Sequence, residues 1–176
     1  MKIIKEIFSP GSIDKTYEGL FAVIKKVSIP DGCIDMATFI VSELFANVKE
    51  HSFAKKGILE CSISGSTFFF SLEDNGIGIK NSFIKNGIFA KDDRTALQLA
   101  TGGLSTKKLN ERAFGLYSVQ RLAERMGGIL VISTGKVKAE FKKKNVLFME
   151  PKKELKGVKV AVKIPLKKIN LYEMLY

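Results

Sequence analysis

The sequence Asp74-Asn75-Gly76-Ile77-Gly78-Ile79 decides how the rest of the chain is interpreted. It follows the apolar, aromatic run Thr67–Leu72, which predicts a buried strand, so Asp74 stands where that strand ends. Gly76 and Gly78 carry no Cβ atom, which lets the backbone turn and approach a ligand closely. The Asp74 carboxylate could then accept a hydrogen bond from the exocyclic amine of a purine. An ordinary strand-to-loop turn with Asn-Gly chemistry explains the same residues equally well.

The length and composition predict one globular domain over residues 1–176. A chain of this size buries roughly two thirds of the surface that its unfolded form exposes. No apolar run reaches the roughly 18 residues that cross a bilayer, and the N-terminus lacks the apolar core of a signal peptide. We therefore expect a cytoplasmic protein without membrane contact. Cys33 and Cys61 have no metal-ligand spacing and are expected to be buried thiols, with neither a disulfide nor a metal site formed by cysteines.

The net charge of +11 arises from 29 basic and 18 acidic side chains. This excess would suit a polyanion such as nucleic acid, or an acidic protein surface. The lysines are spread along the chain, however, and the densest run, Lys142-Lys143-Lys144, falls in a predicted turn between strands. We interpret the lysines as a solvated surface and do not expect nucleic acid binding.

Hydrophobic periodicity and turn residues predict the order of helices and strands. Before Asp74 they predict an edge strand over Lys2–Ser9, a helix from the N-cap Ser12 to about Val27, a helix from Cys33 to about His51, and a hairpin of Ile58–Ser64 with Thr67–Glu73. After it they predict a short helix or a loop over Asn81–Phe89, a helix over Asp92–Ala100, an amphipathic helix around Leu116–Met126, and strands over Ile129–Thr134, Val137–Lys142, Val146–Met149 and Gly157–Ile164. The apolar tail over residues 167–176 is expected to pack back on the sheet.

The second predicted helix carries Glu43, Asn47 and His51 at a spacing of four, which places them on one face. Simple amphipathicity accounts for this pattern. The functional interpretation is that Asn47 supplies an oxygen ligand to a hard cation such as Mg²⁺, while Glu43 orients or deprotonates an attacking group.

The segment Gly102–Arg112 is glycine-rich, hydroxylated and basic, and is a candidate lid over phosphate groups. Its donors are backbone N–H groups, the hydroxyls of Ser105 and Thr106, and the ammonium groups of Lys107 and Lys108. The alternative is an exposed loop without a role. The segment directly precedes Ala113-Phe114-Gly115-Leu116, where a glycine in the first turn of a helix favours anion binding.

In their order along the chain these motifs resemble those of the GHKL ATPases, the superfamily of gyrase and histidine kinases. The motifs are Glu43-x3-Asn47-x3-His51, Asp74-x-Gly76-x-Gly78, the Gly-Gly-x-Ser-Thr-Lys loop, Phe114-Gly115-Leu116, and the strand Gly157-Val158-Lys159-Val160. The resemblance covers about residues 12–166, and no single motif in it is specific alone.

The resemblance implies an α/β (α+β) fold, a two-layer sandwich with helices on one face of a mixed, mostly antiparallel sheet, called the Bergerat fold. It implies ATP and Mg²⁺ as cofactors. By analogy Asn47 would hold Mg²⁺, Glu43 would be the catalytic base, and Asp74 would bind the adenine amine. The remaining cofactor-binding residues would be Gly76 and Gly78 at the base, and Gly103, Ser105, Thr106, Lys107, Phe114, Gly115 and Leu116 at the phosphates.

Within the superfamily, the pattern of Asn47, Glu50 and His51 is most similar to that of the small anti-sigma-factor serine/threonine kinases. That similarity implies a protein partner, a sigma factor or an anti-anti-sigma-like regulator, and a homodimer. The alternative is a binding module in which nucleotide controls a partner without phosphoryl transfer. Ala113 stands where the family often has a glycine, and Ile79–Ala100 is a long connection without an assigned role.

Overall fold

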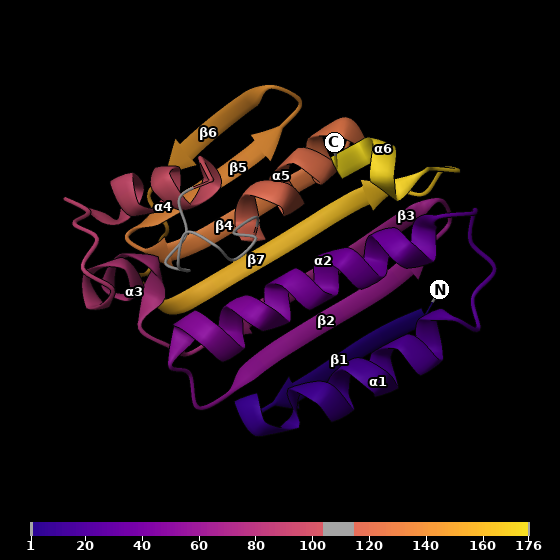
Figure 1. The fold of residues 1–176 in the computed structure, drawn as a ribbon, viewed down its shortest axis with the longest axis horizontal. Coiled ribbons are helices and arrows are strands. Elements are labelled where there is room, and N and C mark those ends of the chain that lie inside the picture. The colour runs from indigo at the N-terminus through magenta and orange to yellow at the C-terminus, as the bar shows by residue number, and fades with distance from the viewer. Residues whose placement is uncertain (1, 104–114, 176) are drawn as a thin grey trace.

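One sheet of seven strands runs through the part of the chain that the computed structural model describes, residues 2–103 and 115–175 (Figure 1). The strands lie in the order β1-β2-β3-β7-β4-β5-β6. Their bounds are β1 Lys2–Phe8, β2 Gly57–Ser64, β3 Thr67–Asp74, β4 Ile129–Gly135, β5 Val137–Lys142, β6 Asn145–Met149 and β7 Leu155–Pro165.

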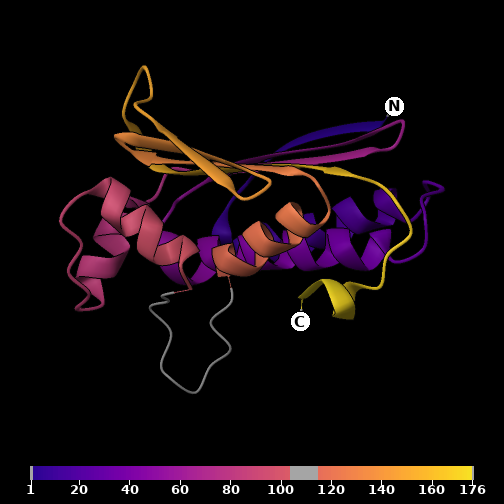
Figure 2. The same ribbon diagram turned by 90° about the horizontal axis from the view of Figure 1, so that it is seen from above.

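The helices gather on one face of this sheet and leave the other face open (Figure 2). They are α1 Ile13–Ile24, α2 Cys33–Asn47, α3 Gly78–Lys85, α4 Asp93–Thr101, α5 Gly115–Arg125 and α6 Leu171–Leu175, with a 3-10 turn η1 Pro10–Ser12 and a π-helical turn η2 Val48–Ser52. The predicted two-layer sandwich is confirmed. None of the described helices combines the length and the apolar composition needed to cross a lipid bilayer.

Every strand pairing in the described sheet is antiparallel. The family resemblance implied a mixed, mostly antiparallel sheet, and the described strands form no parallel pair. The reason lies in the position of β7. The chain leaves β3, crosses the helical face and returns as β4, and these two strands are parallel to each other because both are antiparallel to β7. Because β7 is inserted between them, the parallel pair never forms a ladder.

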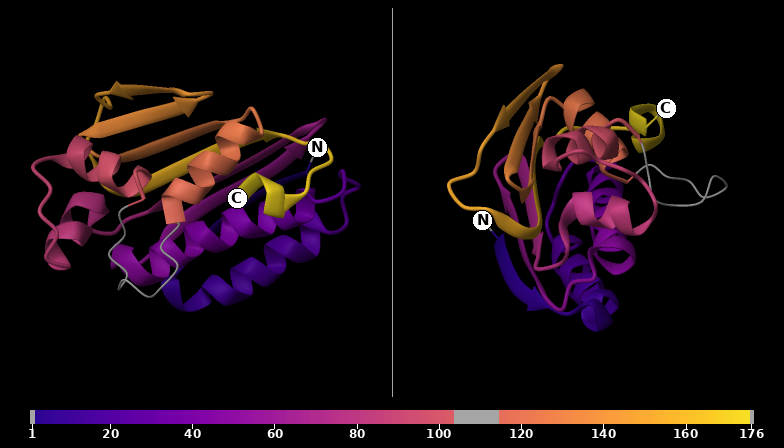
Figure 3. Two further views of the ribbon diagram at one scale, coloured as in Figure 1. Left: turned by 45° about the horizontal axis from the view of Figure 1, so that its top comes forward. Right: turned by 90° about the vertical axis from the view of Figure 1, so that its left-hand side faces the viewer.

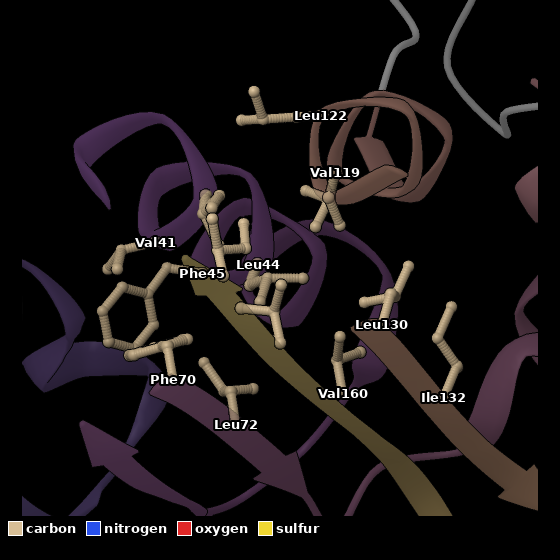
Figure 4. Packing of buried hydrophobic residues seen from close by; sticks show 14 of the residues in the cluster. Val41, Leu44, Phe45, Phe70, Leu72, Val119, Leu122, Leu130, Ile132 and Val160 are labelled. Atoms are coloured by element: carbon tan, nitrogen blue, oxygen red, sulfur yellow. The ribbon is translucent and has the colours of Figure 1, made fainter. Parts of the chain in front are cut away.

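The core lies between the sheet and the helices α1, α2 and α5. Side chains at alternate positions of a strand point to the same face, which is why β4 has a regular alternation of buried and half-buried residues. Figure 4 shows the residues that meet across the layers: Leu44 and Phe45 of α2, Val119 and Leu122 of α5, Phe70 and Leu72 of β3, Leu130 and Ile132 of β4, and Val160 of β7. The Phe45 and Phe70 rings meet edge to face, with centroids 6.5 Å apart.

Helix ends differ from the predictions at two places. Helix α1 ends at Ile24 rather than near Val27, because Lys26 and Val27 donate to carbonyls only three residues back and so tighten the last turn. Helix α2 ends at Asn47, and the chain to Ser52 continues as a π-helical turn that closes at Phe53 with a φ of 52°. The segment Asn81–Phe89, predicted as a short helix or a loop, is helical only up to Lys85, and this helix, α3, begins earlier, at Gly78.

The C-terminal tail packs on the helical layer and not on the sheet, as Figure 3 shows. Arg125 of α5 donates from Nη1 to the carbonyl oxygen of Met174 at 2.8 Å and to that of Glu173 at 3.2 Å. Leu171, Met174 and Leu175 pack against the core, so the apolar part of the tail covers helix surface. Both cysteines are buried thiols, as predicted.

Candidate functional site

A cavity opens between α2, α3 and α5 at the end of β3. Its empty volume is about 800 Å³, a figure that includes space open to solvent. Its lining is mainly apolar with a few polar groups: Leu44, Asn47, Val48, His51, Ser52, Leu72, Asp74, Gly78, Ile79, Ser82, Phe83, Ala100, Gly115, Leu116, Val158 and Val160.

Asp74 is the buried carboxylate of this cavity, with only 6% of its surface exposed. Its Oδ1 accepts a hydrogen bond from the N–H of Gly76 at 2.7 Å. Burial raises the pKa of the Asp74 carboxyl above its usual value of 3.8, although backbone N–H groups of Gly76 and Val158 act in the opposite direction. The carboxylate is therefore held in place by backbone donors while it faces an apolar pocket.

Two glycines of the Asp74 motif are needed for close packing. A Cβ atom on Gly76 would collide with the carbonyl of Ser52 and come within 2.7 Å of Asp74 Oδ1. Gly78 has a φ of +79°, which favours glycine, and a Cβ atom there would lie 3.1 Å from Thr134 Oγ1. These positions let the loop turn sharply from β3 into α3 beneath the cavity.

The opposite wall is formed by Asn47 of α2 and Gly115 of α5. A Cβ atom on Gly115 would lie 3.5 Å from Asn47 Oδ1, so the first turn of α5 comes close to the Asn47 amide. Nδ2 of Asn47 is buried and has no hydrogen-bond partner among the described residues. A buried amide without a partner at the N-terminus of a helix is suited to a ligand that carries anionic oxygens.

The residues predicted from sequence are distributed unequally around this cavity. Asn47, Asp74, Gly78, Gly115 and Leu116 line it. Gly76 lies buried behind the Asp74 carboxylate and is not among the lining residues. Gly103 is exposed after the end of α4, and the half-buried Glu43 of α2 does not belong to the described lining. Ser105, Thr106, Lys107 and Phe114, together with Lys108 and Ala113, lie outside the described residues.

Several lining residues were not predicted from sequence. Leu72, Val158 and Val160 form an apolar wall from β3 and β7, and in sequence they have the same pattern as any buried strand residue. Thr134 of β4 is fully buried behind the site and accepts a hydrogen bond from the N–H of Ile79 at 3.2 Å. Ser82 lies on α3, the segment that the sequence left undecided between a helix and a loop.

The site thus combines an apolar slot, a buried hydrogen-bond acceptor and an amide beside a helix N-terminus. These groups fit a flat, amine-bearing ring at the Asp74 side and anionic groups at the Asn47 side. Within the described residues, no cluster of three or more His, Cys, Asp or Glu side chains could hold a metal ion. An Mg²⁺ ion that enters with phosphate groups needs only one or two protein ligands, so Asn47 Oδ1 is compatible with that role.

Comparison with protein families gives one match. The family described as histidine kinase-, DNA gyrase B-, and HSP90-like ATPase matches residues 34–168. The matched range includes every wall of the cavity, from α2 to β7. No curated protein matches the chain significantly.

Proposed function

The chain belongs to the histidine kinase-, DNA gyrase B- and HSP90-like ATPase family, a family of ATP-binding domains, and we propose that it is a regulatory protein. It would transfer the γ-phosphate of ATP to a serine or threonine of a partner protein. The observation that carries the nucleotide part of this proposal is the buried, backbone-anchored carboxylate of Asp74 in an apolar cavity. The partner would be a sigma factor or an anti-anti-sigma-like regulator, and the active form would be a homodimer.

The residues of the cavity suit the parts of ATP. Asp74 would accept a hydrogen bond from the exocyclic amine of adenine, and Leu72, Val158 and Val160 would contact the ring. The Asn47 side chain has an amide oxygen and an amide nitrogen, so its Oδ1 can bind Mg²⁺ while Nδ2 donates to a phosphate oxygen. The N-terminus of α5 at Gly115 would stabilise the phosphate charge.

Phosphoryl transfer in this site would depend on positioning and charge stabilisation. Bound Mg²⁺ would neutralise charge on the phosphate oxygens. Glu43 would accept the proton of the attacking hydroxyl, and it lies on α2 one helical turn before Asn47. Glu43 is not among the described lining residues, so this role requires the attacking hydroxyl to approach from outside the nucleotide pocket.

A second candidate function is a nucleotide-switched binding module without phosphoryl transfer. The position of Glu43 outside the lining favours it, because a base must reach the hydroxyl that it deprotonates. In that function ATP would order a surface that a regulator binds.

Incubation with γ-labelled ATP, Mg²⁺ and a candidate partner separates the two functions. Label on the partner that disappears in Glu43→Gln and persists in Glu18→Gln, a change at an exposed position of α1, supports the kinase. ATP binding without transfer or hydrolysis supports the module. A titration with ATP and Mg²⁺ that shows no binding would contradict both.

A further inference from the structure

Ser82 lines the cavity and carries a buried hydroxyl to which the family match and the sequence motifs assign no role. It lies on α3, between the motif residue Gly78 and the loop that precedes α4. Only 6% of Ser82 is exposed, and the residue lines the cavity together with its helix neighbours Ile79 and Phe83. Its Oγ atom is buried and has no hydrogen-bond partner among the described residues.

An unpaired buried hydroxyl is unfavourable unless a ligand satisfies it. A helical serine commonly donates to the carbonyl four residues earlier, as Ser52 Oγ does to Val48 at 2.7 Å in this chain. No such bond satisfies Ser82 Oγ among the described residues. Within the described residues the hydroxyl lacks a partner, and a molecule bound in the cavity could supply one.

Helix α3 is anchored at both ends, so the backbone that carries this hydroxyl has a fixed position before a ligand enters. At the start of the helix, Gly78 makes a turn that favours glycine, and the N–H of Ile79 donates to the buried Thr134 Oγ1 at 3.2 Å. At its end, Asn86 donates from Nδ2 to the carbonyl oxygen of Ser82 at 2.8 Å. Ligand binding therefore requires little ordering of this residue.

Ser82 lines the same cavity as Asp74 and follows it closely along the chain. Helix α3 follows the Asp74 motif directly, whereas Asn47 and Gly115 close the cavity from α2 and α5. A hydroxyl can donate to an unprotonated ring nitrogen, and Asp74 can accept from an amine on the same ring. Together they suit a purine that has both an amine donor and ring-nitrogen acceptors, which is the pattern of adenine.

We propose that Ser82 is a specificity-determining residue of the nucleotide site, whose hydroxyl donates a hydrogen bond to a ring nitrogen of the bound adenine. This inference rests on the proposed ATP-binding function and extends it to a position outside the family's motifs. A site that hydrogen-bonds a substrate group discriminates against analogues that lack the group, because its own polar atom is then left unpaired.

The test measures binding of ATP and of 1-deaza-, 3-deaza- and 7-deaza-ATP, each with Mg²⁺, by isothermal titration calorimetry. One deaza analogue should bind wild-type protein about 3- to 10-fold more weakly than ATP, the range expected for one neutral hydrogen bond. Ser82→Ala should lose a similar factor for ATP and should bind that analogue and ATP equally. Ser64→Ala, at the exposed far end of the β2–β3 hairpin, should behave like the wild type.

The stability of the variant separates folding from binding. Ser82→Ala should melt at the wild-type temperature or above it without nucleotide, because it removes an unpaired buried group. Ser82→Cys, which retains the volume and has only a weak donor, should give the same binding pattern if the alanine variant fails to fold. If both variants bind ATP with wild-type affinity, or lose the same factor for all four nucleotides, the inference about Ser82 is wrong. The proposed ATP-binding function would still stand. Absence of ATP binding to the wild type would overturn the proposed function as well.

Discussion

Gly157 of β7 lies directly against Asp74 of β3. A Cβ atom on Gly157 would come within 2.7 Å of Asp74 Oδ1 and would collide with the carbonyl oxygen of Asp74. The buried carboxylate of the candidate site therefore keeps its position only because the neighbouring strand has no side chain at this point. Two residues 83 positions apart in the sequence, from 74 to 157, are thus parts of one structural unit.

The first prediction concerns this contact. Gly157→Ala should lower the free energy of unfolding by about 1–3 kcal/mol, because the added methyl group forces the two strands apart. It should also weaken ATP binding, since Asp74 must move. Urea unfolding and calorimetric titration measure the two effects.

The control is Gly19→Ala in α1, where a Cβ atom would meet nothing within 4 Å. That change should raise the free energy of unfolding by about 0.5–1 kcal/mol, because alanine is the better helix former. A Gly157→Ala protein with wild-type stability and affinity would show that the two strands are not packed as described.

The second prediction concerns Asp74 as a hydrogen-bond acceptor. Asp74→Asn should weaken ATP binding by about 10- to 100-fold, because the carboxamide removes the charge and one of the two acceptor oxygens. The comparison variant is Asp14→Asn at an exposed position of α1, which should bind as the wild type does. If Asp74→Asn binds ATP normally, the assignment of the base-binding end is wrong.

The ionisation of Asp74 gives this prediction a pH dependence. Burial raises the pKa of the carboxyl above 3.8, so the folded protein holds the proton more tightly than the unfolded chain. The contribution of Asp74 to the free energy of unfolding is therefore largest below pH 3.8 and falls as the pH rises through the raised pKa. ATP affinity should change in the opposite direction and decrease as the pH falls through that raised pKa. In the Asp74→Asn variant, ATP affinity measured over the same pH range should not show this decrease.

The third prediction concerns Thr134. Thr134→Val should lower the free energy of unfolding by about 1–3 kcal/mol, because it leaves the N–H of Ile79 unpaired in the interior. Hydrogen exchange should accelerate first at the start of α3. Ser133→Ala on the opposite face of β4 serves as the control. Equal exchange rates in both variants would contradict the proposed anchoring of α3.

The fourth prediction concerns the C-terminal tail. Arg125→Ala removes the donor that binds the carbonyl groups of Glu173 and Met174, so α6 should detach from α5. Limited proteolysis should then cleave the segment after Pro165 faster, while the melting temperature changes little because α6 contributes only half-buried or exposed side chains. Arg121→Ala should show wild-type cleavage, because Arg121 forms an ion pair with Glu124 on the same helix. Equal cleavage of both variants would mean that Arg125 does not retain the tail.

The fifth prediction concerns Cys61. Burial raises the pKa of its thiol to about 12, so almost no thiolate is present at mildly alkaline pH. Iodoacetamide should modify Cys61 slowly in the native protein and rapidly in urea, as peptide mass spectrometry can follow. Rapid modification of the folded protein would show that β2 opens locally.

Much of the fold could be predicted because it depends on local patterns. The hairpin of β2 and β3 was predicted from two apolar runs around Gly65-Ser66, and α5 from its strongly amphipathic spacing. The pairing of β7 with β3 and β4 could not be predicted, because contacts between distant strands leave no periodic signal in the sequence.

Residues of the candidate site could be predicted from the sequence where the residue type is unusual for its position in a strand or helix. Asp74 at the end of an aromatic strand and Gly115 at a helix start are such residues. Val158 and Val160 belong to a motif strand but were not assigned to the site, because a strand that contacts a ligand has the same apolar alternation as one that contacts the core. Ser82 was missed because its role depends on which face of α3 meets the cavity, and that is decided by the turn at Gly78.

Because β7 lies in the middle of the sheet, it also determines when the sheet can be completed during synthesis. The strand is the last to leave the ribosome, yet it joins β1–β3 to β4–β6 and forms one wall of the cavity. Until residues 155–165 emerge, β3 and β4 each have an edge whose backbone N–H and C=O groups lack the strand that pairs with them in the finished sheet. A nascent chain that stalls before this point would therefore depend on chaperones and would have no nucleotide-binding activity.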